Sequence, residues 1–381
     1  MKVAIAHDYI KEYGGAERVL EALTEIFPDA PIYTAFYDKK GTAYRHFKHK
    51  KIIPSWVQDI PFFVNKLHSP LRFLAPFIWE SFDLSEYDVV ISSASWYVTK
   101  GFKKHFDKSH FIEICYCHTP PRWLYGYNTS VNFQKYALVR IYAAIVGHFM
   151  RLYDFKAAQK VNYFIANSSE VAERIKKFYR RDSTVIYPPA ELDDRGLKME
   201  NRKSSKNYYL IVSRLVGAKG LDLAVDAALK MGFKLKIAGS PAGYYFKQNK
   251  LREKAQGQVE FLGQVTDVEL VKLYKGAKAF LATAYDEDFG ITPVEAMSVG
   301  TPVIAFNGGG YKETVINGKT GLLFDDYSAD GLCKAIEKFE GLKISYKDCI
   351  NQAQKFSKER FVKEIKDFLN SKVKNQNSKL K

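Results

Sequence analysis

Cysteine is scarce in this sequence, and no long apolar run is uninterrupted. Among 381 residues there are four cysteines, at Cys115, Cys117, Cys333 and Cys349. None belongs to a Cys-x-x-Cys pair, which excludes the common zinc and dithiol redox motifs. We interpret Cys115 and Cys117, which share one face of a predicted strand, as structural. The most apolar neighbourhood, residues 137–153, contains two arginines and a histidine, so it does not predict a membrane-spanning helix.

Acidic residues are in the minority, and the first residues do not show the pattern expected of a leader. The 58 Lys and Arg residues outnumber 42 Asp and Glu residues, giving a net charge of +16. This excess favours a phosphate-bearing substrate, nucleic acid or an anionic membrane surface as partner. Residues 1–6 read directly as a strand, with no charged and apolar leader before it. We therefore expect a reduced, cytoplasmic protein.

Several familiar catalytic motifs are also absent. The sequence has no Gly-x-x-x-x-Gly-Lys-Ser/Thr loop, no His-Glu-x-x-His helix and no Gly-x-Ser-x-Gly turn. The first strand-to-helix turn holds Gly14 and Gly15 but does not match Gly-x-Gly-x-x-Gly, which disfavours a dinucleotide oxidoreductase. Glycines before a helix allow a phosphate to approach free N–H groups, although such a pair can also simply form a turn.

Short apolar runs alternate with helical patterns along the whole chain, which predicts an α/β fold with parallel sheets. We expect two doubly wound, Rossmann-like domains, at residues 1–187 and 207–355, joined by a linker at 188–206. The linker begins with two prolines and continues with Lys, Ser and Asn. Residues 356–381 are expected to form a last helix, over Lys358–Leu369, and a frayed basic tail.

The expected strands are those whose apolar runs end at turn residues. In the first domain they are Val3–Ala6, Ile32–Ala35, Val89–Ser92, Phe111–Tyr116, Tyr163–Ala166 and Thr184–Tyr187. In the second they are Tyr208–Val212, Lys234–Ala238, Val259–Leu262, Ala279–Ala282, Pro302–Ala305 and Gly321–Phe324. The expected helices include Ala16–Phe27, Leu221–Met231, Val268–Tyr274, Thr292–Val299 and Ala329–Phe339.

The most informative stretch runs from residue 285 to 297. A strand ends before it, a Phe-Gly turn follows, and Thr292 or Pro293 is expected to open a helix. Glu287 precedes the turn and Glu295 follows it eight residues later, so both carboxylates can reach one ligand beside a phosphate-binding helix terminus. Carboxylates in this position suit the hydroxyl groups of a ribose or a sugar.

Three further groups stand where strands are expected to end. Arg214 and Lys219 are separated by one turn, so both can contact a single anion, unless they only face solvent. His118 and Arg122 follow a first-domain strand, at the edge where open α/β sheets bind ligands. A lone histidine there can also be structural. Asp8 and Tyr9 end the first strand and could line an acceptor site; for them a helix cap or a core role is equally compatible. 

With these motifs, the sequence resembles the retaining glycosyltransferases of family four, which have the GT-B fold of two Rossmann-like domains facing a central cleft. Their Glu-x-Phe-Gly-x-x-x-x-Glu motif fits Glu287 to Glu295. The resemblance implies that Glu287 contacts the donor sugar and that Glu295 binds the ribose. It assigns the sugar and diphosphate to the backbone of Phe289, Gly290, Ile291 and Thr292.

The same resemblance implies roles for the other groups. Arg214 and Lys219 would bind the donor diphosphate, and His118 would reach the donor sugar from the opposite domain. We expect closure of the cleft to bring His118 and the turn at Gly14 and Gly15 to the donor. Arg122, which we expect to bind the acceptor, lies in a His-Thr-Pro-x-Arg setting that is most similar to GDP-mannose-dependent mannosyltransferases of polysaccharide and glycan biosynthesis. The last helix of the family typically crosses back to the first domain. 

We therefore expect a metal-independent, retaining hexosyltransferase with no bound cofactor, which moves mannose from GDP-mannose to a glycan or lipid-linked acceptor. A UDP-sugar donor is the first alternative, and a sugar-nucleotide epimerase of the same fold is the second. Asp286-Glu287-Asp288 is formally an Asp-x-Asp metal motif, but it overlaps the better-matched glutamate pair.

A basic segment at residues 39–51 precedes aromatic residues at positions 56, 62, 63, 73, 77 and 79. This pattern suits peripheral contact with an anionic membrane, at the inner face of the cell membrane. It equally suits a solvated loop followed by an ordinary core. A basic nucleic-acid-binding module is a remote alternative, because no nucleic-acid-binding motif accompanies the patch, and we expect no nucleic-acid partner.

Overall fold

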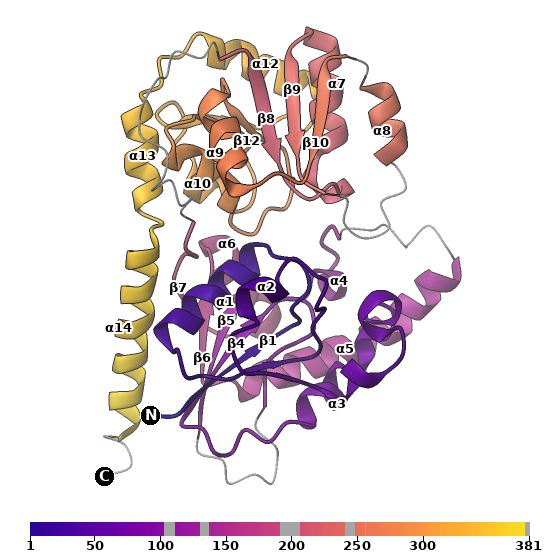
Figure 1. Cartoon of the computed structure of the whole chain (residues 1–381), viewed down its shortest axis with the longest axis vertical. Helices are drawn as coiled ribbons and strands as arrows, with labels where there is room; N and C mark the ends of the chain where they lie inside the picture. The colour runs from indigo at the N-terminus through magenta and orange to yellow at the C-terminus, as the bar shows by residue number, and fades with distance from the viewer. Residues whose placement is uncertain (103–110, 130–136, 191–205, 241–247, 256, 378–381) are drawn as a thin grey trace. The chain divides into compact units, whose positions relative to one another are not determined.

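The computed structural model describes residues 1–102, 111–129, 137–190, 206–240, 248–255 and 257–377. The chain divides into two compact units (Figure 1). The first comprises Met1–Tyr127, Phe133–Pro189 and Lys358–Lys381, and the second comprises Asn128–Asn132 and Ala190–Ser357. Most of the predicted linker, residues 191–205, lies outside the described residues. Each unit has its own parallel sheet covered by helices, which confirms the predicted fold class of two Rossmann-like α/β domains.

The first unit contains a seven-stranded sheet in the order β3-β2-β1-β4-β5-β6-β7, and every strand pair in it is parallel. The strands are β1 (Val3–His7), β2 (Ile32–Thr34), β3 (Ile52–Pro54), β4 (Val89–Ala94), β5 (Ile112–Cys117), β6 (Tyr163–Ala166) and β7 (Ser183–Val185). Strand β3 was not predicted from the sequence. It is a three-residue edge strand that ends in proline, so it lacks the apolar run used to predict the others.

Helices cover both faces of this sheet because successive strand residues point to opposite sides. Ile5 packs with α1 (Gly15–Ile26), whereas Ala4 and Ala6 pack with α3 (Ala75–Glu80) and α5 (Ala137–Lys160). On the same face as α5, α6 (Ser169–Tyr179) covers the buried thiols of Cys115 and Cys117. Two short helices, α2 (Tyr44–Phe47) and α4 (Arg122–Tyr125), lie in connecting loops.

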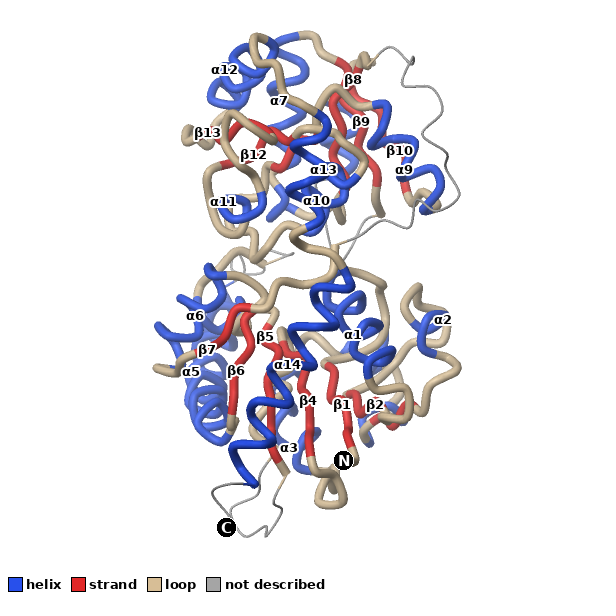
Figure 2. Tube along the Cα trace, turned by 90° about the vertical axis from the view of Figure 1, so that its left-hand side faces the viewer, coloured by secondary structure: helices blue, strands red, loops and turns tan. Residues whose placement is uncertain are grey.

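The last helix, α14 (Lys358–Asn377), belongs to the first unit although it ends the sequence. It lies beside α1 on the sheet (Figure 2), where Phe361, Ile365 and Phe368 join the core. The predicted frayed tail is therefore shorter than expected. The helix continues eight residues past Leu369, and Lys372 packs its ammonium group over the ring of Tyr163 at 5.1 Å. 

The second unit contains a six-stranded parallel sheet in the order β10-β9-β8-β11-β12-β13. Its strands are β8 (Tyr208–Val212), β9 (Lys234–Ala238), β10 (Val259–Gly263), β11 (Phe280–Ala282), β12 (Val303–Phe306) and β13 (Gly321–Phe324). All six occur where the sequence predicted them. Helices α7 (Leu221–Met231) and α12 (Ala329–Glu340) cover one face. The remaining helices are α8 (Gln248–Lys254), α9 (Asp267–Gly276), α10 (Ile291–Ser298), α11 (Tyr311–Thr314) and α13 (Tyr346–Gln354).

Both sheets reverse their strand order at one position, between β1 and β4 in the first unit and between β8 and β11 in the second. Open α/β sheets bind ligands beyond the carboxyl ends of the strands at such a reversal. The loops that leave these strands are therefore where a site is expected. Within the described residues, no helix is long and apolar enough to cross a membrane.

Candidate functional site

In the second unit, a cation and a carboxylate predicted to bind the donor lie in contact. Lys219 ends the short 3-10 helix η5 (Gly217–Lys219) after β8, and Glu287 lies in the loop after β11. The Nζ atom of Lys219 is 2.6 Å from Oε2 of Glu287. Both side chains are partly exposed, at 28% and 17%. The strand reversal thus brings two residues 68 positions apart in the sequence to one place, where a ligand can reach both.

Close backbone contacts hold this pair in position. Gly220 has φ +66°, and a Cβ atom there would lie 2.1 Å from the carbonyl oxygen of Thr283. The hydroxyl of Thr283 in turn donates to the carbonyl of Lys219 at 2.9 Å. A side chain at position 220 would therefore push the lysine loop away from the end of β11, and glycine is required here.

A run of three glycines, which was not predicted as part of the site, supports the loop that contains Glu287. Gly308, Gly309 and Gly310 follow β12, and Gly310 donates its N–H to the carbonyl of Glu287 at 2.9 Å. A Cβ atom at Gly309 would lie 2.1 Å from that same carbonyl oxygen. The run allows two backbones to touch, and three consecutive glycines after a strand were the signal that could have indicated it.

Tyr311, the next residue, was also not predicted. Its hydroxyl donates to Oε2 of Glu287 at 3.3 Å. Burial, with the Glu287 carboxylate as a second cause, raises the pKa of Tyr311 well above its ordinary value. The phenol therefore stays neutral and remains a donor, so that the Glu287 carboxylate has two supports, Lys219 and Tyr311.

Glu295 lies on the fifth residue of α10 and is 2% exposed. Its Oε2 accepts a hydrogen bond of 2.8 Å from the hydroxyl of Tyr274 on α9. A buried carboxylate needs such partners. The helix begins at Ile291, one residue earlier than predicted, after Gly290, whose φ of +92° favours glycine. Phe289 is buried against Phe356, with ring centroids 5.3 Å apart. These contacts fix the start of α10.

Arg214 follows β8 in the same connection as Lys219, and its side chain is exposed. Leu215 and Val216, which come next, are buried and anchor the connection to the sheet. The structure thus places both predicted diphosphate-binding cations in one loop at the strand reversal. Among the described residues, no three His, Cys, Asp or Glu side chains cluster as a metal site would require.

The first unit brings its predicted histidine into a chain of buried polar groups. His118 follows β5 and is 8% exposed. Its Nε2 lies 2.7 Å from Oγ of Ser93, which in turn lies 3.0 Å from Nδ1 of His7. His7 and Ser93 face each other in the register of β1 and β4, the two strands at the reversal. Neither His7 nor Ser93 was predicted from the sequence as a site residue.

The chain extends to the predicted glycine turn. Nε2 of His7 lies 3.6 Å from Oε1 of Glu17, which is close enough for electrostatic attraction but too long for a hydrogen bond. The other oxygen of Glu17 accepts the N–H of Gly14 at 2.9 Å. Gly14 caps α1, which begins at Gly15. Two site elements predicted separately, the glycine turn and His118, are therefore linked through Glu17, His7 and Ser93.

Asp8 and Tyr9 have extensive structural contacts. One oxygen of Asp8 accepts from Ser95 N and Oγ and from Trp96 N, at 3.0, 2.7 and 2.5 Å, and the other accepts from the Thr99 hydroxyl. These hydrogen bonds connect the end of β1 to the loop after β4, which is consistent with a structural role of Asp8 in the core. Tyr9 stacks on Phe36, with ring centroids 5.1 Å apart. Their acceptor role stays a prediction.

Arg122 is half-buried at the start of α4, in the loop that also contains His118. Within that loop, the hydroxyl of Thr119 accepts a 3.2 Å hydrogen bond from Arg174, whose side chain is 3% exposed. Arg174 also packs over the ring of Tyr127, with its Cζ 4.1 Å from the centroid. Helix α6, which carries Arg174, therefore holds the loop after His118.

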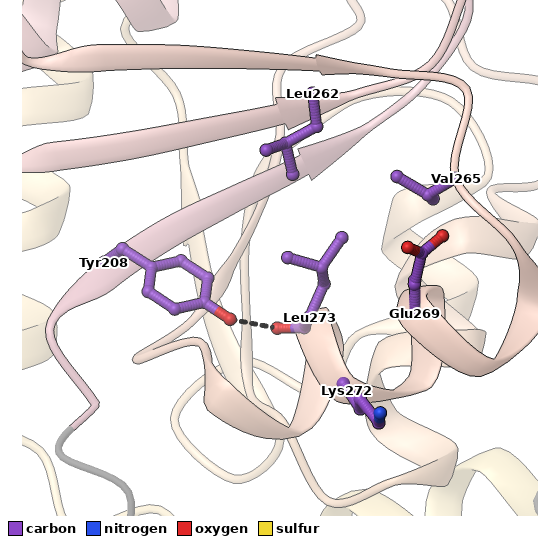
Figure 3. A pocket seen from close by; sticks show the side chains of 6 residues that line it. All are labelled: Tyr208, Leu262, Val265, Glu269, Lys272 and Leu273. Carbon is purple, nitrogen blue, oxygen red and sulfur yellow. Dashed lines mark hydrogen bonds between the residues drawn. The ribbon is translucent and has the colours of Figure 1, made fainter.

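A pocket of about 310 Å³ lies elsewhere in the second unit (Figure 3). It is lined by Tyr208, Leu262, Val265, Glu269, Lys272 and Leu273, and the hydroxyl of Tyr208 donates to the Leu273 carbonyl at 2.8 Å. None of the predicted site residues lines it, so we do not assign the donor to this pocket.

In the predicted basic and aromatic patch, some aromatic side chains are buried and others are exposed. Phe63 and Trp79 are buried in the core, whereas Trp56, Phe62 and Phe77 are 43%, 70% and 60% exposed. The ordinary core thus accounts for part of the aromatic stretch and not for all of it. 

Comparison with known proteins gives a family match for the second unit. Residues 195–356 match the model of the family described as Glycosyl transferases group 1. The chain is 24% identical over 256 residues to D-inositol 3-phosphate glycosyltransferase of Corynebacterium glutamicum, covering 60% of this chain and 61% of the relative. It is 27% identical over 296 residues to alpha-1,3/1,6-mannosyltransferase ALG2 of Rhizomucor pusillus, covering 64% and 63%. The matched part spans about three fifths of these curated relatives.

Solved structures have a similar fold over nearly the whole length of this chain. Sucrose-phosphate synthase from Thermosynechococcus elongatus has a TM-score of 0.76 at 17% identity, covering 98% of this chain and 100% of that one. Anabaena HepE, solved in complex with UDP and glucose, has a TM-score of 0.71 at 19% identity, covering 97% and 100%. At these identities the likeness establishes the fold, which is GT-B.

Proposed function

We propose, from the match of residues 195–356 to Glycosyl transferases group 1, that the protein is a retaining, metal-independent glycosyltransferase. It transfers a sugar from a nucleotide donor to a glycan or lipid-linked acceptor. The observation that carries this proposal is the contact between Lys219 and Glu287 at the strand reversal of the second unit. A cation and a hydroxyl-binding carboxylate side by side suit the junction between diphosphate and sugar.

In this proposal, different residues of the second unit bind different parts of the donor. Arg214 and Lys219 bind the diphosphate, and Glu287 accepts hydrogen bonds from sugar hydroxyls. The first N–H groups of α10, after Gly290, face a phosphate, which the helix dipole also favours. Glu295, one helical turn further on, accepts hydrogen bonds from the ribose hydroxyls. 

The same groups account for the chemistry. Cleavage of the sugar–phosphate bond releases negative charge on the diphosphate, and two cations stabilise that charge most in the transition state. No protein nucleophile is assigned, because the departing phosphate itself takes the proton from the acceptor hydroxyl on the same face of the sugar. We assign His118, Gly14 and Gly15 to contacts with the donor sugar, and Asp8, Tyr9 and Arg122 to the acceptor.

GDP-mannose is our first proposed donor and a UDP-sugar is the second. A mannosyltransferase among the relatives supports the first, and a fold neighbour solved with UDP supports the second. Neither likeness identifies the nucleoside base of the donor that this chain binds. An epimerase of the same fold would bind the same donors but would form an epimer without an acceptor.

A thermal-shift screen tests the proposal directly. Purified protein is mixed with GDP, UDP, ADP or their common sugar conjugates, and with a short DNA duplex, in the presence of EDTA. A ligand that binds only the folded state raises the melting temperature, so one nucleoside diphosphate should raise it and thereby identify the base. A response to DNA alone would reject the transferase. Incubation of the responding sugar nucleotide with acceptor, followed by NMR of the anomeric proton, separates retaining transfer from epimerisation.

We also propose that the first unit contacts an anionic membrane, at the inner face of the cell membrane, through α5. Five apolar side chains on this helix are 36% to 66% exposed: Ile141, Ile145, Phe149, Leu152 and Phe155. Their spacing places them along one side of the helix over about 20 Å. The only acidic residue of α5, Asp154, is fully buried, whereas Arg140, His148, Arg151 and Lys156 are exposed. His148 lies within this apolar face, Arg140 and Arg151 lie along its margin, and Lys156 comes directly after Phe155 at its end. An apolar face with basic margins suits the surface of an anionic bilayer, and it supports a lipid-linked acceptor.

A further inference from the structure

The buried polar chain of the first unit consists of four side chains from four elements. Glu17 comes from α1, His7 from β1, Ser93 from β4, and His118 from the loop after β5. Their exposed fractions are 9%, 2%, 0% and 8%. Buried polar side chains are costly unless each finds a partner, so the order of the donors and acceptors along the chain is constrained.

The carboxylate at one end determines the direction of the chain. Glu17 can only accept, and its Oε1 lies 3.6 Å from Nε2 of His7, so a proton on that nitrogen is favoured electrostatically. In neutral His7 the other nitrogen, Nδ1, is then an acceptor. It lies 3.0 Å from Ser93 Oγ, and the serine must donate its only hydroxyl proton to it.

The serine passes this constraint on to His118. With its proton given to His7, the Ser93 oxygen is left as an acceptor, and it lies 2.7 Å from Nε2 of His118. That nitrogen must therefore carry a proton, which leaves Nδ1 as the acceptor nitrogen of neutral His118. A hydrogen bond to one ring nitrogen thus determines which of the two nitrogens carries the proton, as carboxylate partners do for catalytic histidines.

We infer that Glu17, His7 and Ser93 are positioning residues that fix the tautomer and ring orientation of His118. The glycine turn takes part, because the second oxygen of Glu17 accepts the N–H of Gly14 at 2.9 Å. The glycine turn and His118, which we assign to donor contacts, are thereby held in one arrangement. The effect on turnover rests on the proposed function, whereas the tautomer itself does not.

Nitrogen-15 NMR of the full chain, labelled at histidine, tests the tautomer without any substrate. His7→Gln and His118→Gln spectra assign the two rings. At neutral pH we expect Nε2 of both rings to be of the protonated type and Nδ1 of both to be of the acceptor type. Ser93→Ala should move the His118 nitrogen signals toward the averaged values of a mixed population, and Ser93→Thr, which keeps the hydroxyl, should restore them. A His118 protonated on Nδ1, or one unaffected by Ser93→Ala, overturns the inference.

Ser92→Ala is the matched control. Ser92 precedes Ser93 on β4, it is equally buried, and its hydroxyl has no hydrogen-bond partner among the described residues. Its replacement should leave the His118 signals unchanged. With an active sugar nucleotide, Ser93→Ala and Glu17→Gln should lower kcat by about tenfold or more, with little change in the KM for the donor. Ser92→Ala should leave kcat unchanged. Absence of turnover in the wild-type protein would reject the proposed function, while the NMR result would still decide the tautomer.

Discussion

The ammonium group of Lys219 and the carboxylate of Glu287 lie 2.6 Å apart, although we assign them to different parts of the donor. Each residue is therefore part of the surroundings of the other. A substitution at either position changes both the diphosphate contact and the sugar contact. Effects on binding and turnover should consequently not be independent.

A double-mutant cycle with Lys219→Met and Glu287→Gln should reveal this dependence. We expect each single change to remove most turnover. The loss in kcat/KM of the double variant, expressed as a free energy, should differ from the sum of the two single losses by about 0.5–3 kcal/mol. In the free energy of unfolding the coupling should stay below about 1 kcal/mol, because both side chains are partly exposed to solvent. Lys230→Met removes a cation from the exposed pair with Asp330 in the same unit and is the control. Additive losses in kcat/KM would contradict the shared site.

Glu295 and Tyr274 allow the ribose assignment to be tested separately. Glu295→Gln keeps an oxygen for the Tyr274 hydroxyl, which donates at 2.8 Å, so the fold should survive. It should weaken nucleoside diphosphate binding about tenfold, because a charged acceptor is lost. The wild-type protein should also prefer a nucleotide with ribose hydroxyls over its 2′,3′-dideoxy form, and the variant should lose that preference. Calorimetric titration measures both, and an unchanged preference would remove Glu295 from the ribose site.

The fold was largely predictable because the strands are apolar runs that end at turns. All six strands of the second unit were predicted, and so was α7, whose bounds agree. The exceptions are elements with a weak pattern. Edge strand β3 contains only three residues and ends at Pro54, and α14 continues into a Lys- and Asn-rich segment that looked like a frayed tail.

The candidate site was predictable only where a short motif contains the residues. Glu287 and Glu295 lie in one motif, whereas His7 and Ser93 are 86 residues apart and meet because of the register between β1 and β4. In the same way, Tyr311 and Glu287 meet because they follow the neighbouring strands β12 and β11. Such contacts follow from the strand order, which is not visible in a local pattern.

The membrane surface proposed on α5 predicts a specific loss. A triple variant with Ile145→Gln, Phe149→Gln and Leu152→Gln lacks three exposed apolar side chains. Glutamine is a good helix former, so α5 should be retained. We expect the wild-type protein to float with vesicles of phosphatidylcholine and phosphatidylglycerol, and the triple variant to partition about tenfold or more weakly. 

Two controls separate this effect from general stickiness. Val268→Gln removes an exposed apolar side chain, 54% exposed, from the second unit and should not alter flotation. Vesicles of phosphatidylcholine alone, or added salt, should reduce binding because the basic margins of α5 then contribute little. Equal flotation of the triple variant and the wild type would place the membrane contact elsewhere or exclude it.

His68 gives the first unit a predictable sensitivity to acid. Its ring packs against Phe36 with centroids 5.5 Å apart, and its Nδ1 is buried without a hydrogen-bond partner in the described part of the chain. Burial, and then the charge of Lys11, lower the pKa of His68 from 6.5 to about 4. The unfolded chain therefore binds a proton as the pH falls through 6.5, whereas the folded chain does so only near 4. Between these values the unfolded state holds more protons, so the free energy of unfolding must decrease as the pH is lowered.

The full effect should reach about 3 kcal/mol at the acid end of this range. Urea unfolding at several pH values measures it as a difference between variants. His68→Gln cannot titrate, so its free energy of unfolding should fall less steeply than that of the wild type between pH 6.5 and about 4. His148→Gln, which changes an exposed histidine on α5, should keep the wild-type slope. Lys11→Gln should give an intermediate slope, because it removes the second cause of the lowered pKa and leaves the first, burial, in place. If His68→Gln and the wild type had the same slope, His68 would have the same pKa in the folded and unfolded chain, and another group would be responsible for the loss of stability in acid.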